Sequence, residues 1–126
     1  MGGGTILVTG GAKRIGRVIC TQLANDGFAI AVHYRNSASE ASDLARAIVS
    51  MGGSATTVQC DLSDSGATST LIDEASGALG PVFGLVNNAS MFVHDDIATF
   101  DEASWDAHMA VNARAPMMLI RSLCQR

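Results

Sequence analysis

The pattern of apolar and polar positions predicts four short strands that alternate with longer helical segments. Runs rich in apolar or β-branched residues occur at 5–9, 28–33, 55–59 and 82–86, and glycine, proline or polar residues bound them. Strands that alternate with helices are typical of repeated βαβ units around a parallel sheet. The sequence therefore predicts an α/β fold, namely a Rossmann-type doubly wound parallel sheet with about four βα units.

The segments between these runs repeat their apolar residues at helical spacing. The first predicted helix ends at Gly27, the second spans about 39–51, and the third ends at Gly80. A last helix begins near Asp101 and runs toward the C-terminus, and Pro116 is expected to kink it or to leave one carbonyl without a partner. The side chains predicted to face the core from the first three helices are Ile15, Val18, Ile19 and Leu23, then Ala41, Leu44, Ala45 and Ile48, then Leu71, Ile72, Ala75 and Leu79.

Composition is typical of one folded domain over residues 1–126. The chain is 48% hydrophobic and 16% charged, and no apolar run approaches the roughly 20 residues of a membrane-spanning helix. The net charge of −4 disfavours a nucleic-acid partner, which would need a basic stripe. We therefore expect a protein that binds neither membranes nor nucleic acid.

The three cysteines indicate a reducing environment. Cys20, Cys60 and Cys124 are odd in number, widely spaced and located in apolar segments, so we expect buried free thiols and no disulfide or metal site. The N-terminus has no charged leader followed by an apolar core. These features predict a cytoplasmic protein.

A glycine-rich turn follows the first predicted strand and precedes the first predicted helix. Residues 6–16 are Ile-Leu-Val-Thr-Gly-Gly-Ala-Lys-Arg-Ile-Gly. Glycines at such a turn let backbone N–H groups at a helix N-terminus approach an anion. Arg14 stands where the usual dinucleotide pattern has its middle glycine, so an ordinary tight turn is the alternative. The residues predicted to contact a cofactor phosphate here are Gly10, Lys13, Arg14, Ile15 and Gly16.

The end of the second predicted strand favours NADP(H) over NAD(H). An NAD site normally places a carboxylate here for the ribose hydroxyls, whereas residues 27–39 contain no acidic side chain. Arg35 is a good phosphate ligand and Ser37 adds a hydroxyl donor. The alternative is a solvated surface arginine. The predicted cofactor contacts are His33, Tyr34, Arg35, Asn36 and Ser37.

Polar residues also follow the third and fourth predicted strands. Asp61, which precedes Leu62, could accept a hydrogen bond from an adenine amino group or could cap the next helix with help from Ser63. Asn87-Asn88-Ala89-Ser90 follows the fourth strand at the carboxyl edge of the sheet, where open α/β folds bind ligands. We expect the asparagines to cross-link neighbouring loops and to line a cofactor cleft.

In this order, the motifs resemble the short-chain dehydrogenase/reductase family. They are Thr9-Gly10-x-x-x-Arg14-x-Gly16, Asp61-Leu62, Asn87-Asn88-Ala89 and Asn112. The pteridine reductase branch is the most similar, through Ala12-Lys13-Arg14, His33-Tyr34 with Ser37-Ala38 and Glu40-Ala41, and Asn88-Ala89-Ser90 with Phe92.

The resemblance implies roles for individual residues. Arg14 would reach the cofactor phosphates and the substrate, while Ser90 and Phe92 would lie near the nicotinamide, with the Phe92 ring on a flat heterocycle. Asn112 would match the asparagine of the catalytic tetrad. Plain loop packing is the alternative for Phe92, and a polar partner for a kinked backbone is the alternative for Asn112. The residues implied to hold the cofactor also include Arg35, Asn36, Ser37, Asp61, Leu62, Asn88 and Ala89.

The family's tyrosine and lysine pair has no counterpart in these 126 residues, because Tyr34 and Lys13 are the only residues of their types and both lie in the predicted cofactor region. We expect the chain to be the N-terminal, cofactor-binding half of an NADPH-dependent reductase of a small carbonyl or pteridine-like substrate. By itself it should be inactive, and the full-length form should be a homodimer or homotetramer. The alternatives are a non-catalytic NADP-binding or redox-sensing module and a Rossmann domain for another nucleotide.

Overall fold

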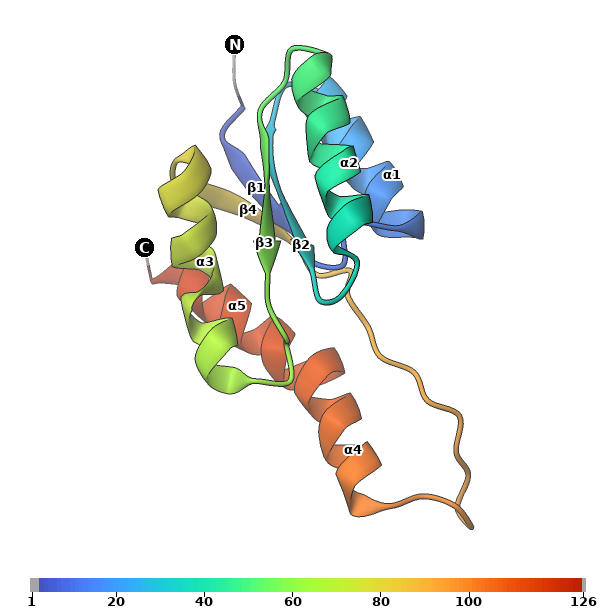
Figure 1. Ribbon diagram of the computed structural model, residues 1–126. Helices are drawn as coiled ribbons and strands as arrows, with labels where there is room; N and C mark the ends of the chain where they lie inside the picture. The colour runs from blue at the N-terminus through green and yellow to red at the C-terminus, as the bar shows by residue number, and fades with distance from the viewer. Residues whose placement is uncertain (1–2, 126) are drawn as a thin grey trace.

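The computed structural model describes residues 3–125, which form a four-stranded parallel sheet covered by helices on both faces (Figure 1). The strands are β1 (Thr5–Val8), β2 (Ala29–Tyr34), β3 (Ala55–Gln59) and β4 (Val82–Val86). Their order in the sheet is β3-β2-β1-β4, and every neighbouring pair is parallel. The predicted Rossmann-type α/β fold and its four strands are confirmed.

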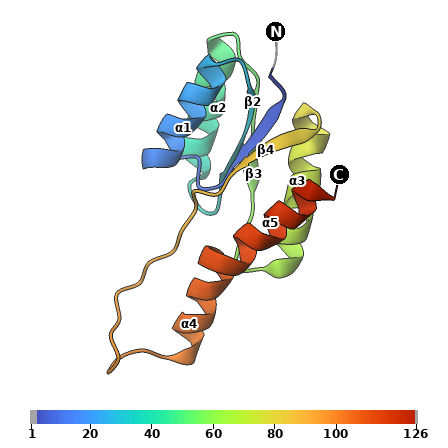
Figure 2. The ribbon, with the colours of Figure 1, turned by 180° about the vertical axis from the view of Figure 1, so that it is seen from behind.

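The helices lie in two layers and one extension. α1 (Arg14–Asn25) and α2 (Ala38–Ser50) cover one face of the sheet, and α3 (Ser65–Leu79) and α5 (Ala115–Cys124) cover the other. α4 (Glu102–Met109) and the segment that joins it to β4 extend past the carboxyl ends of the strands, as both views show (Figures 1 and 2). The carboxyl edge of the sheet therefore faces this extension.

Most of the predicted apolar faces are buried. Ala41, Leu44 and Ile48 of α2 pack with β1 and β2 in one core cluster, while Leu71 and Ile72 of α3 pack in the cluster on the opposite face. The glycines predicted to end the first and third helices, Gly27 and Gly80, have positive φ angles of 99° and 103°, and Gly52 after α2 has a φ of 92°.

The predicted buried face of α1 is wrong in part. Ile15 and Val18 are 69% and 68% exposed, whereas Gly16 and Cys20 face the sheet. Gly16 lies against the carbonyl of Gly10, and a side chain there would overlap it. This close approach sets the rotation of α1 and turns Ile15 and Val18 outward.

The last helical region contains a wide turn. Between α4 and α5 lies a π-helical segment, η1 (Ala110–Arg114), and Pro116 is in the first turn of α5. Pro116 has no N–H to offer the carbonyl of Asn112, and a widened turn accommodates such a gap. The predicted disturbance is therefore confirmed as a π-helical turn.

The prediction for the cysteines is partly confirmed. All three are free thiols, and Cys20 and Cys60 are buried, but Cys124 near the end of α5 is exposed. Its position on the final turn of the helix leaves it beyond the edge of the core. None of the helices in residues 3–125 combines the length and apolar character that crossing a membrane requires.

Candidate functional site

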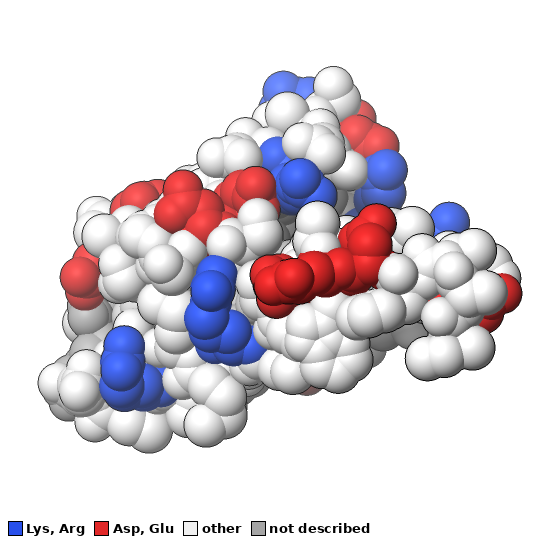
Figure 3. Space-filling view, turned by 90° about the horizontal axis from the view of Figure 1, so that it is seen from below, with Lys and Arg blue, Asp and Glu red and all other residues white. Residues whose placement is uncertain are grey.

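A cavity of about 480 Å³ lies at the carboxyl edge of the sheet, where the loops after β1, β2, β3 and β4 meet. Figure 3 shows the molecule from the side on which the carboxyl edge lies, and acidic and basic side chains lie near one another on this face. The walls of this cleft are Gly10, Lys13, Arg14, Ile15, Gly16, His33, Arg35, Cys60, Asp61, Leu62, Asn88, Ala89, Ser90, Met91 and Val111.

The structure thus brings most of the predicted site residues together and leaves five outside the walls of the cleft. Those five are Tyr34, Asn36, Ser37, Phe92 and Asn112. Tyr34 packs against the core on the face covered by α1 and α2, and Phe92 lines a separate groove with Trp105 and Met109.

Three wall residues were not among the predicted contacts, namely Cys60, Met91 and Val111. Cys60 directly follows β3, so its place after a parallel strand was a usable signal. Val111 reaches the cleft only because η1 lies beside it, which no local pattern indicates.

The glycine turn presents an uncapped helix N-terminus to the cleft. The first hydrogen bond of α1 runs from the Arg17 N–H to the Lys13 carbonyl, so the N–H groups of Arg14, Ile15 and Gly16 precede the helical ladder. Lys13, at the N-cap position, makes no side-chain capping bond. These N–H groups and the positive end of the helix dipole can bind an anion.

Arg14 adopts a backbone conformation that favours glycine. Its φ is +51°, the only positive value for a non-glycine residue among residues 3–125. A left-handed conformation of this kind costs about 1–2 kcal/mol. It occurs at the position where the usual dinucleotide pattern has glycine, and the exposed Arg14 side chain lies at the wall of the cleft.

The buried His33 side chain is hydrogen-bonded to the glycine turn. Its Nδ1 accepts a hydrogen bond from the Gly10 N–H at 2.9 Å, and its Nε2 lies 2.9 Å from the Cys60 carbonyl. Because a carbonyl only accepts, Nε2 carries the proton and the ring is neutral. Burial lowers the pKa of His33 below its ordinary value of 6.5, and the bond to Cys60 offsets this only in part. His33 therefore ties the loops after β1, β2 and β3 together.

This bond corrects one detail of the predicted anion site. The Gly10 N–H is already donated to His33, and the Gly11 N–H is donated to the His33 carbonyl at 2.9 Å. The N–H groups of Gly10 and Gly11 are therefore already used, whereas those of residues 14–16 precede the helical ladder and can meet a phosphate.

Thr9 and Asn88 join the loop after β4 to the same turn. The Thr9 hydroxyl accepts hydrogen bonds from the Asn88 and Ala89 N–H groups, each at 3.0 Å. The Asn88 side-chain amide donates to the carbonyls of Thr9 and Gly10, each at 3.1 Å. Asn88 thus makes the cross-link expected of this segment, and the turn is held from two sides.

Two ion pairs occupy the rim of the cleft. The guanidinium of Arg35 lies 3.7 Å from the Asp61 carboxylate, and the Lys13 ammonium lies 3.5 Å from Glu40 in the first turn of α2. All four side chains are substantially exposed, so each pair is weak and an incoming anion can replace the carboxylate.

Asp61 does not cap α3, which corrects one of its two predicted roles. Its carboxylate accepts from the N–H and hydroxyl of Ser63 at 3.0 and 2.7 Å, and these bonds lower its pKa below 3.8. The cap of α3 is Asp64, which accepts from the Ala67 N–H at 3.1 Å. A capping side chain accepts from an N–H two or three positions further along the chain, and Asp64, the residue before α3, accepts from the third.

Asn112 lies behind the cleft on η1. Its side-chain oxygen accepts from the Met91 N–H and its amide donates to the Met91 carbonyl, both at 2.8 Å. The pair of bonds holds the segment after β4 against the π-helical turn. In residues 3–125, no three His, Cys, Asp or Glu side chains are grouped as metal ligands would be.

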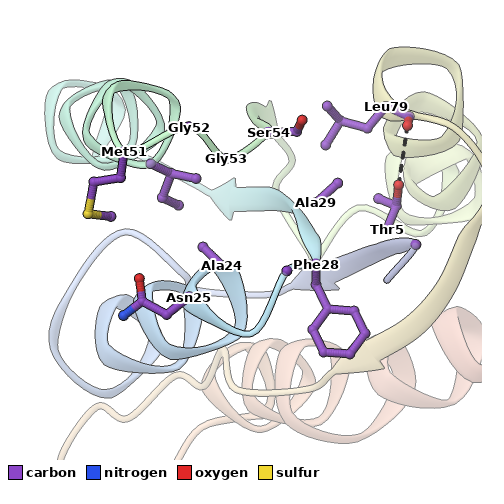
Figure 4. A pocket seen from close by; sticks show the side chains of 13 residues that line it. Thr5, Ala24, Asn25, Phe28, Ala29, Met51, Gly52, Gly53, Ser54 and Leu79 are labelled. Carbon is purple, nitrogen blue, oxygen red and sulfur yellow. Dashed lines mark hydrogen bonds between the residues drawn. The ribbon is translucent and has the colours of Figure 1, made fainter. Parts of the chain in front are cut away.

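A second cavity, of about 530 Å³, lies at the opposite, amino edge of the sheet (Figure 4). Its walls include Thr5, Asn25, Phe28 and Ser54, and the Thr5 hydroxyl donates to the Leu79 carbonyl at 3.4 Å. No charged side chain or histidine lines it among the residues that the structure describes. The groups suited to binding an anion are those of the carboxyl edge.

Comparison with known proteins matches residues 4–126 to the family model described as short chain dehydrogenase. Elsinochrome reductase 1 of Elsinoe fawcettii is 34% identical over 119 residues, which make up 94% of this chain and 45% of that protein.

Solved structures superpose closely on the chain. The crystal structure of FolM alternative dihydrofolate reductase 1 from Brucella canis complexed with NADP has a TM-score of 0.93 and 40% identity, covering 98% of this chain and 49% of that one. A blue fluorescent protein from a metagenomic library, in complex with NADPH, has a TM-score of 0.93 and 31% identity, covering 98% and 51%. The chain spans about half the length of the relatives it matches.

Proposed function

Because the chain belongs to the short-chain dehydrogenase family, we propose that it is the NADP(H)-binding half of a reductase that acts on a carbonyl or pteridine-like substrate. The observation that carries the proposal is the uncapped start of α1, where three N–H groups and the exposed Arg14 side chain face one cleft.

The residues present fit the two charged parts of the cofactor. The N–H groups of residues 14–16 suit the pyrophosphate, because Gly16 leaves no side chain between them and the turn. Arg35 and Lys13 suit the 2′-phosphate, and Ser37 is at the N-cap of α2 without a side-chain capping bond, so its hydroxyl is available. His33 lines the same cleft and supports the site through its bond to the Gly10 N–H.

The substrate end of the site would lie at the loop after β4. When bound, NADPH supplies a hydride for reduction of a carbonyl or imine carbon. Ser90 is at the wall of the cleft, where its hydroxyl would orient the nicotinamide end. Asn112 would keep Met91 in place there, and Phe92 would meet a flat heterocycle after a movement from its present groove toward the cleft.

The similarity to a protein described as an alternative dihydrofolate reductase, at 40% identity, supports the pteridine-like class of substrate. We place the protein in the cytoplasm, in keeping with its free thiols, and as a homodimer or homotetramer in the full-length form. Trp105 and Met117 are exposed apolar side chains of α4 and α5 that such an assembly would cover.

Titration calorimetry with NADP⁺ and NAD⁺ tests the cofactor assignment. Arg35→Ala should weaken NADP⁺ binding about tenfold or more, the loss of a charge-assisted hydrogen bond, and should leave NAD⁺ binding unchanged. Arg46→Ala is the matched control, because Arg46 pairs with Asp43 on the outer side of α2. An unchanged ratio of the two affinities in Arg35→Ala would contradict the proposal.

A second measurement tests the substrate class. A longer form of the protein that contains a Tyr-x-x-x-Lys motif should oxidise NADPH in the presence of a pterin, and Phe92→Leu should raise the KM for the pterin more than it lowers kcat. The 126-residue chain should show no such rate. If the 126-residue chain alone oxidised NADPH as fast as the longer form, the Tyr-x-x-x-Lys motif would not be the source of the activity.

A further inference from the structure

The segment from residue 87 to residue 101 leaves the cleft and runs along an open path to α4 (Figures 1 and 2). Near the cleft, side chains of the last helical region hold it at two points. Asn112 holds both backbone groups of Met91, and His108, one turn earlier, accepts the Val93 N–H at its Nε2 at 3.0 Å.

The His108 ring is fixed by its contacts on both sides. Its Nδ1 lies 2.7 Å from the Ser104 carbonyl, and a carbonyl can only accept. The proton is therefore on Nδ1, which leaves Nε2 bare for the Val93 N–H. The two contacts require the same neutral tautomer, opposite to that of His33.

The two anchored residues flank Phe92. The backbone bonds at Met91 and Val93 therefore fix the course of the chain on both sides of Phe92, whose ring lines the groove beside α4. Phe92 is 81% exposed, and Met91 lines the cleft. The placement of the segment therefore depends on the two anchors.

We propose that His108 is a positioning residue for the cofactor cleft: by accepting the Val93 N–H it keeps Ser90 and Met91 at the cleft wall. The inference rests on the proposed function, because the cleft is taken as the NADP(H) site. α4 buries none of its residues, so the helix does not need His108 to complete a core. The hydrogen bond from the Val93 N–H is what links His108 to the segment that lines the cleft.

Two substitutions of His108 distinguish the roles of its two ring nitrogens. His108→Asn keeps an amide at the Nδ1 position and loses the group that reaches Val93, whereas His108→Gln places an acceptor near the Nε2 position. Both variants and the wild type would be compared by amide hydrogen exchange and by calorimetry. The ligands are NADP⁺, which reaches the loop after β4 with its nicotinamide, and adenosine 2′,5′-bisphosphate, which occupies only the adenine end.

In His108→Asn, exchange at Val93 should accelerate strongly, and exchange at Met91 should accelerate less because Asn112 still binds its backbone. NADP⁺ binding should weaken about fivefold, the factor of one lost hydrogen bond, and adenosine 2′,5′-bisphosphate should bind as before. His108→Gln should restore both properties. In the wild type, the nitrogen spectrum of the His108 ring should show the Nδ1–H tautomer.

Equal loss of both ligands, or no loss of NADP⁺ in His108→Asn, would overturn the positioning role. The failure of the proposed function gives a different result, since the wild type would then bind neither ligand. In that event the exchange rates at Val93 still decide whether His108 holds the segment, and unchanged exchange in His108→Asn would reject it.

Discussion

Replacing His33 by phenylalanine should destabilise the protein and remove a pH dependence at the same time. The ring is buried and makes two hydrogen bonds, to the Gly10 N–H and to the Cys60 carbonyl. Phenylalanine has a similar shape and leaves both groups buried without these partners. An unsatisfied buried group costs about 1–3 kcal/mol, so the loss should be about 2–6 kcal/mol in the free energy of unfolding.

The sign of the pH effect follows from the pKa of His33, which burial lowers below 6.5 in the folded protein. The unfolded chain therefore binds the proton more readily, and stability rises with pH wherever it does so. The contribution of His33 is complete above 6.5 and decreases as the pH falls below 6.5 toward the folded value. The decrease is at most about 1.4 kcal/mol per pH unit.

Chemical denaturation between about pH 5 and about pH 8 measures both effects, since this range lies above the ordinary titration of carboxyl groups. The wild type should lose stability toward the acid end, and His33→Phe should lack that slope. His94→Gln, a change at an exposed histidine, is the control and should behave as the wild type. The same acid slope in His33→Phe and the wild type would refute the assigned hydrogen bonds.

Three further changes test the local structure by denaturation or chemical labelling. Gly16→Ala should destabilise the protein by about 1–3 kcal/mol because its methyl group overlaps the preceding turn, whereas Gly77→Ala, in open space on α3, should stabilise it by about 0.5–1 kcal/mol; equal effects would contradict the close packing. Asp64→Ala should cost about 1 kcal/mol through the lost cap of α3, and a change within error would reject that cap. Cys124 should react first with a thiol reagent and Cys20 last, because burial raises the pKa of Cys20 to about 12; peptide mapping by mass spectrometry reads the order, and early labelling of Cys20 would contradict its burial.

The sheet and most helix faces could be predicted because each rests on a local pattern. β2 needs only the apolar run before Tyr34, and α2 needs only the spacing of Leu44 and Ile48 with glycines after it. The strand order also follows, because βαβ units with right-handed crossovers allow few arrangements. Loops after the strands then meet at one edge, so most of the predicted site residues could be placed together in advance.

The features that could not be predicted depend on contacts between distant segments. His33 was predicted to contact the cofactor because it lies at the end of the second strand, and it does line the cleft. Its bonds to Gly10 and Cys60, which lie 23 and 27 residues away in sequence, had no local signal. The wide turn at η1 is a second case. Pro116 requires only that the Asn112 carbonyl loses its usual donor, and a kink, a free carbonyl or a π-helical turn all satisfy that requirement.

The departures from local rules are concentrated at the start of α1, and this position is itself evidence for a ligand. α3 and α4 begin with the aspartates Asp64 and Asp101 as side-chain caps, whereas α2 at Ser37 and α1 at Lys13 begin without one. Next to it, Arg14 has a left-handed backbone and Ile15 is exposed at the wall of the cleft. Each departure lowers the stability of the protein when no ligand is bound. Proteins keep such unfavourable features mainly where a functional site requires them. A phosphate bound at this turn would satisfy the free N–H groups that a capping side chain satisfies in α3 and α4, so a cap introduced by Lys13→Asp should stabilise α1 and weaken NADP⁺ binding together.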